Sequence, residues 1–395
     1  MRKPIVLVSL ATLAACSGGG PQTVSGSAVG GGSGSTSNHS FVSPTEKKTY
    51  SAIGGVQRYS YSTDDRNVAG QYSQLYAGNA STARNSGITI SYDPRDAIFE
   101  LTISDTPSGA SDSIRFQDPA HRTDFGGTSE PQDGTPDISG KGIRYLQVGS
   151  ASGTVRYDLA QSDTFPVGDA SGQRNVSTFF YQKPGTSTQY VTYAGFVRNA
   201  TAIVQVDPPG GGTSYLRQDN ILERAAFVFG ERTGNSAVPK TGTASYTGDM
   251  IATMVYNPLF DDGVADTYYQ WILGSGTVNV DFAANSFNST FTGTVEDPQY
   301  DVFTSRTHVL NAGATFNAAG TGTIDLANKG GFSGQMNSAR LSQGGNTAAG
   351  NMAGSRVDGA FYGPAANEVG GGFRIVGGTP DERIDILGAF TGKKP

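Results

Sequence analysis

Cysteine and histidine are scarce in this sequence of 395 residues, which contains one cysteine and three histidines. A single cysteine cannot form a disulfide within the chain, and this set is too small for a Cys/His zinc module. Charged residues are also few, at 16% against about 25% in typical globular proteins. The formal net charge of −6 argues against nucleic-acid binding, which needs clustered lysine and arginine.

Long apolar runs are missing as well. Beyond the first sixteen residues, no segment reaches the ~18 consecutive apolar residues expected of a membrane helix. Ile5–Leu13 is apolar but too short to span ~30 Å of hydrocarbon, and it follows the basic pair Arg2 and Lys3. This arrangement predicts a secretory signal peptide over residues 1–15.

The signal peptide ends in Leu13-Ala14-Ala15-Cys16, which resembles a bacterial lipobox. In such a sequence the cysteine receives diacylglyceryl, and further acylation with chains such as palmitate anchors the mature lipoprotein stably. The alternative is an ordinary signal peptide followed by an incidental cysteine. We predict Cys16 as the lipid attachment site, and Ser17 after it, in place of aspartate, favours the outer membrane.

Residues 16–40 consist mainly of glycine, serine, threonine and asparagine. Such a segment buries too little apolar surface to offset its ordering entropy, so we expect a flexible linker. A coil of this length has a root-mean-square span of roughly 25–30 Å, which holds a domain away from the lipid headgroups.

Glycine is plentiful, with 55 residues, and so are tyrosine (18) and phenylalanine (20). Together with the low charge, this composition favours an all-β protein of short antiparallel strands. We expect a β-rich domain over residues 41–236, with strands at Ile88–Tyr92, Ile98–Ile103, Thr154–Tyr157 and Tyr190–Val197. Ser214–Arg224 is the one stretch in which we expect a helix.

From residue 237 onward, apolar and polar residues alternate more regularly. In Phe287–Glu296 the odd positions are mostly apolar or small and the even positions are polar, which is the pattern of a half-buried strand. About eight such runs follow one another. This predicts an eight-stranded antiparallel β-barrel over residues 237–395, with a β-sandwich as the alternative.

Two runs go beyond composition: Phe229–Gly248 (FGERT, then VPKTGTASYTG) and Phe361–Phe373 (FYGPAANEVGGGF), the latter followed by Ile386–Phe390. In the second run we expect Phe361 and Phe373 to pack in the barrel and Glu368 to lie in a turn. Together the runs resemble the handle-to-barrel junction and the last barrel strands of transferrin-binding protein B-like surface lipoproteins.

The resemblance covers residues 238–391 best and implies a handle followed by a barrel. It also implies a lipid-anchored, surface-exposed outer-membrane protein that binds a host or environmental protein or small molecule, often for iron or haem uptake with a TonB-dependent receptor. Full-length members carry two such lobes, whereas this chain has room for one. Transferrin itself is not inferred as the ligand, since its contact residues cannot be placed on this sequence.

The candidate ligand-binding residues are Tyr268, Tyr269, Trp271 and His308. The first three form the densest aromatic run, and exposed tyrosine and tryptophan are preferred interface anchors. His308 could be an axial haem ligand, with tyrosine as the other donor. The plainer alternatives are core packing for the aromatics and one ordinary imidazole on a barrel face.

We expect no enzyme and no resident cofactor. The Gly-x-Ser-x-Gly elbow and the Walker loop are absent, and Asp261–Asp266 lacks the full pattern of a calcium loop. The sequence therefore predicts a non-catalytic ligand-binding lipoprotein, and the alternative is a structural or adhesive envelope lipoprotein without a specific soluble ligand.

Overall fold

The computed structural model describes residues 41–64, 67–76, 84, 86–105, 110–117, 132, 134–138, 140–152, 173–257, 268–297, 312–349, 352–377 and 383–395. The predicted signal peptide, Cys16 and the linker lie outside the described residues, as do Thr154–Tyr157, Asp261–Asp266 and His308. Within the described residues every element is a strand except one short 3-10 turn, η1 (Asn235–Ala237). None of these residues forms a helix long and apolar enough to cross a membrane.

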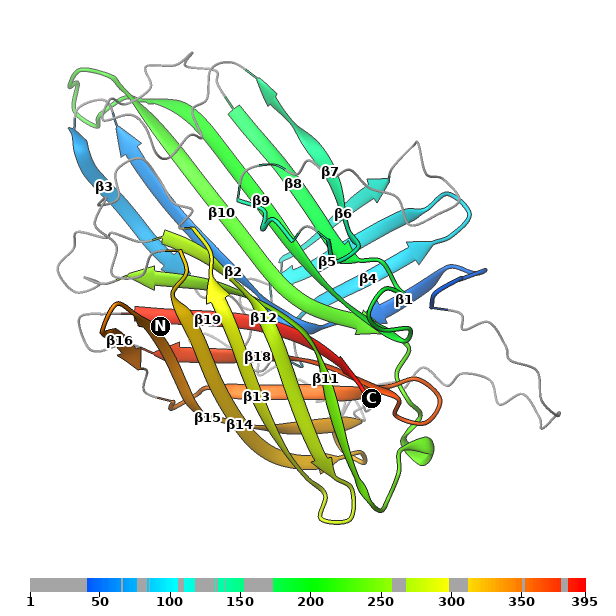
Figure 1. Cartoon of the computed structure of the whole chain (residues 1–395). Coiled ribbons are helices and arrows are strands. Elements are labelled where there is room, and N and C mark those ends of the chain that lie inside the picture. Colours follow the sequence, from blue (N-terminus) through cyan, green and yellow to red (C-terminus); the bar gives the residue numbers. More distant parts are fainter. Residues whose placement is uncertain are drawn as a thin grey trace, which may run out of the picture. The chain divides into compact units, whose positions relative to one another are not determined.

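The N-terminal half forms two antiparallel sheets, which we call the handle (Figure 1). Sheet A has the order β1-β4-β5-β6, with β1 (Lys48–Ser51), β4 (Ile88–Asp93), β5 (Ile98–Asp105) and β6 (Ala110–Gln117). Sheet B has the order β3-β2-β10-β9-β8-β7 and consists of β2 (Ile53–Asp64), β3 (Asn67–Tyr76), β7 (Ile143–Ser152), β8 (Gln173–Gln182), β9 (Val191–Val206) and β10 (Tyr215–Gly230).

The expected helix at Ser214–Arg224 is wrong, because these residues begin the long strand β10. Strand β10 pairs with β9 on one side, from Tyr215 to Gly230, and with β2 on the other. Two neighbouring strands therefore satisfy its backbone groups, and this tertiary pairing overrides the local helical preference.

The C-terminal half is the predicted eight-stranded barrel. Its strands are β11 (Thr243–Asn257), β12 (Tyr268–Asp281), β13 (Ser286–Val295), β14 (Thr315–Asp325), β15 (Gly331–Gln343), β17 (Arg356–Tyr362), β18 (Glu368–Gly377) and β19 (Arg383–Lys393). They pair in the order β14-β13-β12-β11-β19-β18-β17-β15, and the pairing of β14 with β15 closes the ring. The short strand β16 (Asn346–Ala349) pairs with β15 outside this ring. Closure confirms the barrel over the sandwich.

Alternation along the strands fills the barrel with apolar side chains. On β13, Phe287, Phe291 and Val295 are buried, whereas Asn288, Thr290 and Thr292 between them are exposed. Phe361 and Phe373 also lie in this core, as predicted. The ring of Phe291 contacts those of Phe373 and Phe390 at centroid distances of 4.7 and 5.0 Å, so aromatic packing occupies the barrel axis.

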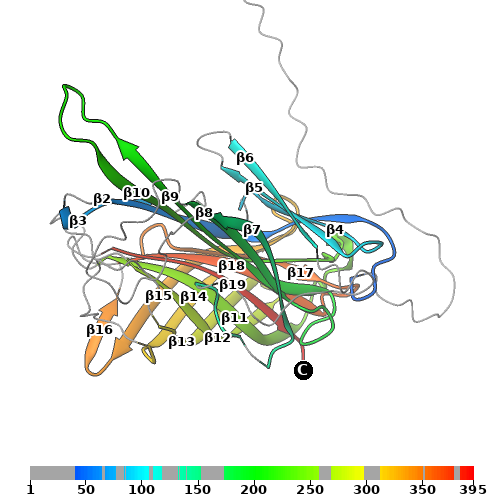
Figure 2. The ribbon, with the colours of Figure 1, turned by 90° about the horizontal axis from the view of Figure 1, so that it is seen from above.

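The part of sheet B next to the barrel is buried on both faces. On β10, Ala225 and Phe227 share one apolar cluster with sheet A, whereas Ala226 and Val228 share another with barrel residues such as Trp271. The long strands β9 and β10 therefore lie between sheet A and the barrel wall (Figure 2). The apolar runs at residues 191–197 and 225–229 follow from this position, because both faces of the sheet are covered there.

Candidate functional site

The two aromatic candidates whose side chains are described lie at the junction between handle and barrel. Trp271 and Tyr269 are each 1% exposed, on the outer wall of the barrel and beneath sheet B. The indole nitrogen of Trp271 donates to the carbonyl of Gly134 at 2.9 Å, and its ring meets Phe180 edge-on at 5.7 Å. Of the two alternatives for these aromatic residues, Tyr269 and Trp271 therefore follow core packing, here at the junction between handle and barrel.

Tyr269 is buried against Arg224 of β10. The guanidinium carbon of Arg224 lies 5.2 Å from the centre of the Tyr269 ring, and the Tyr269 hydroxyl donates to the carbonyl of Leu222 at 3.4 Å. Arg224 also donates to Oδ1 of Asn199 at 3.0 Å. A cation that is 1% exposed thus gains an aromatic face, one side-chain oxygen and backbone carbonyls in exchange for water. The side chains of the other two candidates, Tyr268 and His308, lie outside the described residues.

A second polar contact at the junction was missed by the sequence analysis. Glu368, expected in a turn, is the first residue of β18 and is 4% exposed. Its carboxylate accepts the backbone N–H groups of Gln189, Tyr190 and Val191 at 2.7, 2.8 and 3.2 Å. Burial raises the pKa of Glu368, and the three amide donors oppose that rise.

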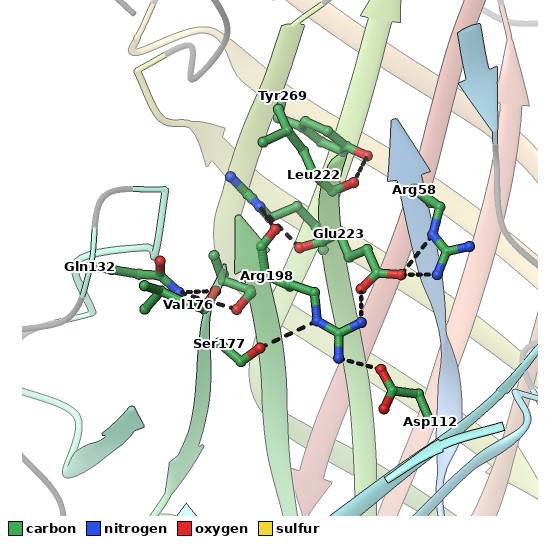
Figure 3. Close-up of polar contacts among 11 residues, drawn as sticks. Arg58, Asp112, Gln132, Val176, Ser177, Arg198, Leu222, Glu223 and Tyr269 are labelled. Carbon is green, nitrogen blue, oxygen red and sulfur yellow. Dashed lines mark hydrogen bonds and ion pairs between the residues drawn. The ribbon is translucent and has the colours of Figure 1, made fainter. Parts of the chain in front are cut away.

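The handle also contains a charged network that joins its two sheets (Figure 3). Glu223 of β10 accepts from Arg58 of β2 at 2.7 Å and pairs with Arg198 of β9 at 2.9 Å. Arg198 also pairs with Asp112 of β6, and donates to Ser177 at 3.3 Å. Charges of alternating sign therefore run from β2 across sheet B to the edge strand of sheet A.

The outer face of sheet A contains a groove of about 370 Å³. Its lining is mostly polar and comprises Lys47, Ser91, Asp93, Ile98, Glu100, Ser113 and Arg115. This volume falls within the roughly 300–1,000 Å³ range of small-molecule sites. Two cations and two anions balance, so the groove suits a polar ligand that offers both donors and acceptors.

Strand register explains this lining. Ser91, Glu100 and Arg115 are neighbours across β4, β5 and β6, and period-2 alternation turns all three to the outer face. Ser113 donates to the Glu100 carboxylate at 3.0 Å, which orients it within the groove. Oγ of Ser91 is buried and has no hydrogen-bond partner among the described residues.

The described residues contain no group of three or more His, Cys, Asp or Glu side chains placed to hold a metal ion. The groove offers carboxylates, hydroxyls and cations on a sheet surface. This arrangement can recognise a ligand by hydrogen bonds and ion pairs.

Comparison with known proteins identifies the barrel. Residues 238–394 match the family model for the C-lobe and N-lobe β-barrels of Tf-binding protein B, and this match covers less than half of the chain. No curated protein matches the sequence. The family model begins at Val238, which agrees with the stretch where the sequence resemblance is best.

Solved structures of transferrin-binding protein B are also matched. A variant from Haemophilus parasuis is 14% identical with a TM-score of 0.29, over 87% of this chain and 76% of that one. The isotype 1 protein from serogroup B Neisseria meningitidis is 14% identical with a TM-score of 0.22, over 89% of this chain and 77% of that one. The C-terminal barrel of this chain, residues 238–394, is therefore similar to the barrels of transferrin-binding protein B.

Proposed function

We propose that this protein is a non-catalytic ligand-binding lipoprotein, anchored in the outer membrane through Cys16 and exposed at the cell surface. The observation that carries the proposal is the match of residues 238–394 to the barrels of a binding protein. The lipobox-like sequence and the linker over residues 16–40 support it, because a tethered domain can reach a partner beyond the membrane surface.

We place ligand contact on the outer groove of sheet A. The barrel interior is filled by apolar side chains, whereas the groove presents Glu100 and Arg115 at the surface. A mixed, balanced set of charges suits a protein surface better than a strongly charged ligand. The ligand we propose is therefore a host or environmental protein.

The matched barrels belong to a protein named for transferrin binding, so iron or haem acquisition is the proposed context. In that context a TonB-dependent receptor would take the captured iron or haem onward. Haem, if bound, is cargo on this proposal.

Capture from mixtures tests the binding proposal. Full-length mature protein, immobilised through its C-terminus, is incubated with serum, iron-loaded proteins and haem-protein complexes. We expect selective retention, and we expect the double reversal Glu100→Lys with Arg115→Glu to weaken it at least tenfold. The double reversal keeps the net charge, and Thr290→Ala on the exposed barrel face is the matched control.

Uniformly negative capture would overturn the binding proposal, and capture that the double reversal leaves unchanged would remove the groove from it. A deletion strain that adheres differently but grows equally on every iron source would instead favour the adhesive alternative.

Lipidation and exposure have separate tests. Metabolic labelling with a palmitate analogue is expected to mark the wild-type chain and to leave Cys16→Ala unlabelled. Protease added to intact cells is expected to digest the protein. Protection from protease in intact cells, with digestion after lysis, would show that it faces the periplasm.

A further inference from the structure

A second cavity lies at the junction of handle and barrel. It measures about 140 Å³ and is lined by Asp137, Ile138, Lys141, Tyr193, Met250, Ile251 and Leu273. The first four residues belong to the handle and the last three to barrel strands β11 and β12. The cavity is separate from the groove on sheet A, with which it shares no lining residue.

The handle side of the cavity is held by hydrogen bonds at both ends of one segment. Gly134 accepts from the Trp271 indole at 2.9 Å, and the carbonyl of Pro136 accepts from the Tyr145 hydroxyl at 3.0 Å. The backbone N–H of Ile138 donates to the same Tyr145 oxygen at 3.3 Å. These bonds fix the wall that Ile138 forms, so the cavity is preformed.

The rim of the cavity is polar. Lys141 pairs with Asp249 at 2.7 Å, and Asp249 also accepts from Gln182 and Ser187 at 3.4 and 3.3 Å. The ammonium of Lys141 is therefore engaged, and Asp137 is exposed to solvent. A charged ligand head would have to compete with these contacts, which favours a neutral ligand.

Tyr193 is the unexplained group in this cavity. It is 2% exposed, and its hydroxyl makes no hydrogen bond to any other described residue. The hydroxyl is not among the fully enclosed polar atoms that lack a partner, so water or a ligand in the cavity can reach it. Burial, followed by the charge of Asp249, raises the pKa of Tyr193 well above its usual range, so the hydroxyl keeps its proton and can donate.

The size of the cavity limits the ligand. An apolar protein cavity of about 150 Å³ accommodates benzene. Here the walls include the apolar side chains of Ile138, Ile251 and Leu273, with one hydroxyl donor among them. We propose that this cavity binds a small neutral ring compound carrying one hydrogen-bond acceptor, which accepts from the Tyr193 hydroxyl.

Phenol and toluene form a matched pair of probes, because a methyl group in toluene replaces the hydroxyl of phenol. Saturation-transfer NMR on the full chain is expected to show saturable binding of phenol, with a dissociation constant on the order of 1 mM or tighter. Intermolecular NOEs from the phenol ring to the methyl groups of Ile251 and Leu273 are expected in the unmodified protein. This readout is independent of any variant.

Two variants and a control locate the site. Tyr193→Phe is expected to weaken phenol about three- to tenfold while leaving toluene unchanged, since one neutral hydrogen bond is lost. Leu273→Trp fills the cavity and is expected to abolish binding of both probes. Thr290→Ala, on the exposed face of the barrel, is expected to change neither.

Absence of saturable phenol binding up to about 10 mM, or of the NOEs, would overturn the proposal and leave a cavity that holds water only. Phenol affinity unchanged in Tyr193→Phe would overturn the assigned role of the hydroxyl. None of these measurements involves the protein ligand proposed above, so either proposal can fail while the other stands.

Discussion

Oε2 of Glu368 accepts a hydrogen bond of 2.8 Å from the backbone nitrogen of Tyr190 and thereby fastens the first residue of β18 in the barrel to the chain entering β9 in the handle. Gln189 and Val191 donate to the same carboxylate. Beside it, the hydroxyl of Thr233 donates to the carbonyl of Gly363 at 2.6 Å. The acidic residue of the FYGPAANEVGGGF run, Glu368, thus holds the handle and the barrel together.

Removal of this carboxylate is expected to destabilise the protein. Glu368→Ala leaves three backbone donors without their partner, and each unsatisfied buried donor costs about 1–3 kcal/mol when water cannot replace it. Because the site is close enough to the surface for partial rehydration, we expect the free energy of unfolding to fall by about 2–4 kcal/mol. Urea unfolding, followed by circular dichroism and by the fluorescence of Trp271, measures the loss.

The conservative variant and a surface variant bracket this result. Glu368→Gln keeps one acceptor oxygen and is expected to lose about half as much stability. Glu100→Ala, on the outer face of sheet A, is expected to stay within about 0.5 kcal/mol of wild type. If Glu368→Ala matched Glu100→Ala, the carboxylate would not hold the junction.

Gly370 provides a steric test of the same junction. A Cβ at Gly370 would lie 2.7 Å from Cγ2 of Val191 and 3.1 Å from the Tyr362 ring, both in buried side chains. Neither neighbour has room to move, so Gly370→Ala is expected to cost about 1–3 kcal/mol by overpacking, measured as a lower urea midpoint.

Gly234 is the matched control for Gly370. It has a φ of −61°, and a Cβ there would meet no atom within 4 Å. Gly234→Ala is expected to leave stability unchanged or to raise it by up to about 1 kcal/mol, because alanine restricts the unfolded chain. Equal midpoints for the two alanine variants would mean that sheet B does not press on Gly370 as described.

The barrel was predictable because the pattern that indicates each strand lies within about ten consecutive residues. The alternation of Phe287, Phe291 and Val295 with polar neighbours states which face is buried, and turn residues separate the strands. Strand β10 was not predictable in the same way. The helix expected at Ser214–Arg224 is overridden by pairing with β9 and β2, and the β2 partners lie more than 150 residues away in the sequence.

The site was less predictable than the fold, for the same reason. Period-2 alternation correctly placed Tyr269 and Trp271 on one face, but it cannot tell whether that face meets water or a second domain. Here the outward wall of β12 is covered by sheet B. The partners of Glu368 are 177–179 residues away, so no local pattern could reveal that its carboxylate is buried.

The charged network in the handle is expected to contribute more to the free energy of unfolding than the exposed ion pair of Arg95 and Asp96 on sheet A. Arg198→Ala removes one of the two partners of Glu223, whose side chain is 5% exposed, and also releases Asp112 of sheet A. Breaking a largely buried pair leaves an uncompensated charge, so we expect a loss of about 2–4 kcal/mol in urea unfolding. The control is Arg95→Ala, whose side chain is 84% exposed and pairs with Asp96. It is expected to lose at most about 0.5 kcal/mol, and a comparable loss in both variants would contradict the assigned role of Arg198.

Alkaline pH is expected to unfold the protein through its buried tyrosines. Burial raises the pKa of Tyr50, Tyr193, Tyr246 and Tyr362 above the ordinary value of 10.0, and the Glu231 carboxylate adds to this effect at Tyr50. Below pH ~10 both the folded and the unfolded state keep these protons, so the stabilisation is fully present. Above it only the unfolded state releases them, and each such group removes up to about 1.4 kcal/mol of stability per pH unit.

Absorbance at 295 nm and circular dichroism, recorded together between pH 9 and 13, test whether stability falls as the pH rises. The exposed tyrosines are expected to ionise first, without loss of structure, and the buried ones in one step that coincides with unfolding. Tyr246→Phe keeps the ring in the barrel core but removes both the ionisable group and its 2.8 Å bond to the carbonyl of Ala366. Because one buried group no longer ionises on unfolding, the free energy of unfolding of this variant is expected to fall less steeply above pH 10 than that of the wild type. Ionisation of every tyrosine near pH 10, with the circular dichroism of the folded state intact, would show that these hydroxyls are open to solvent.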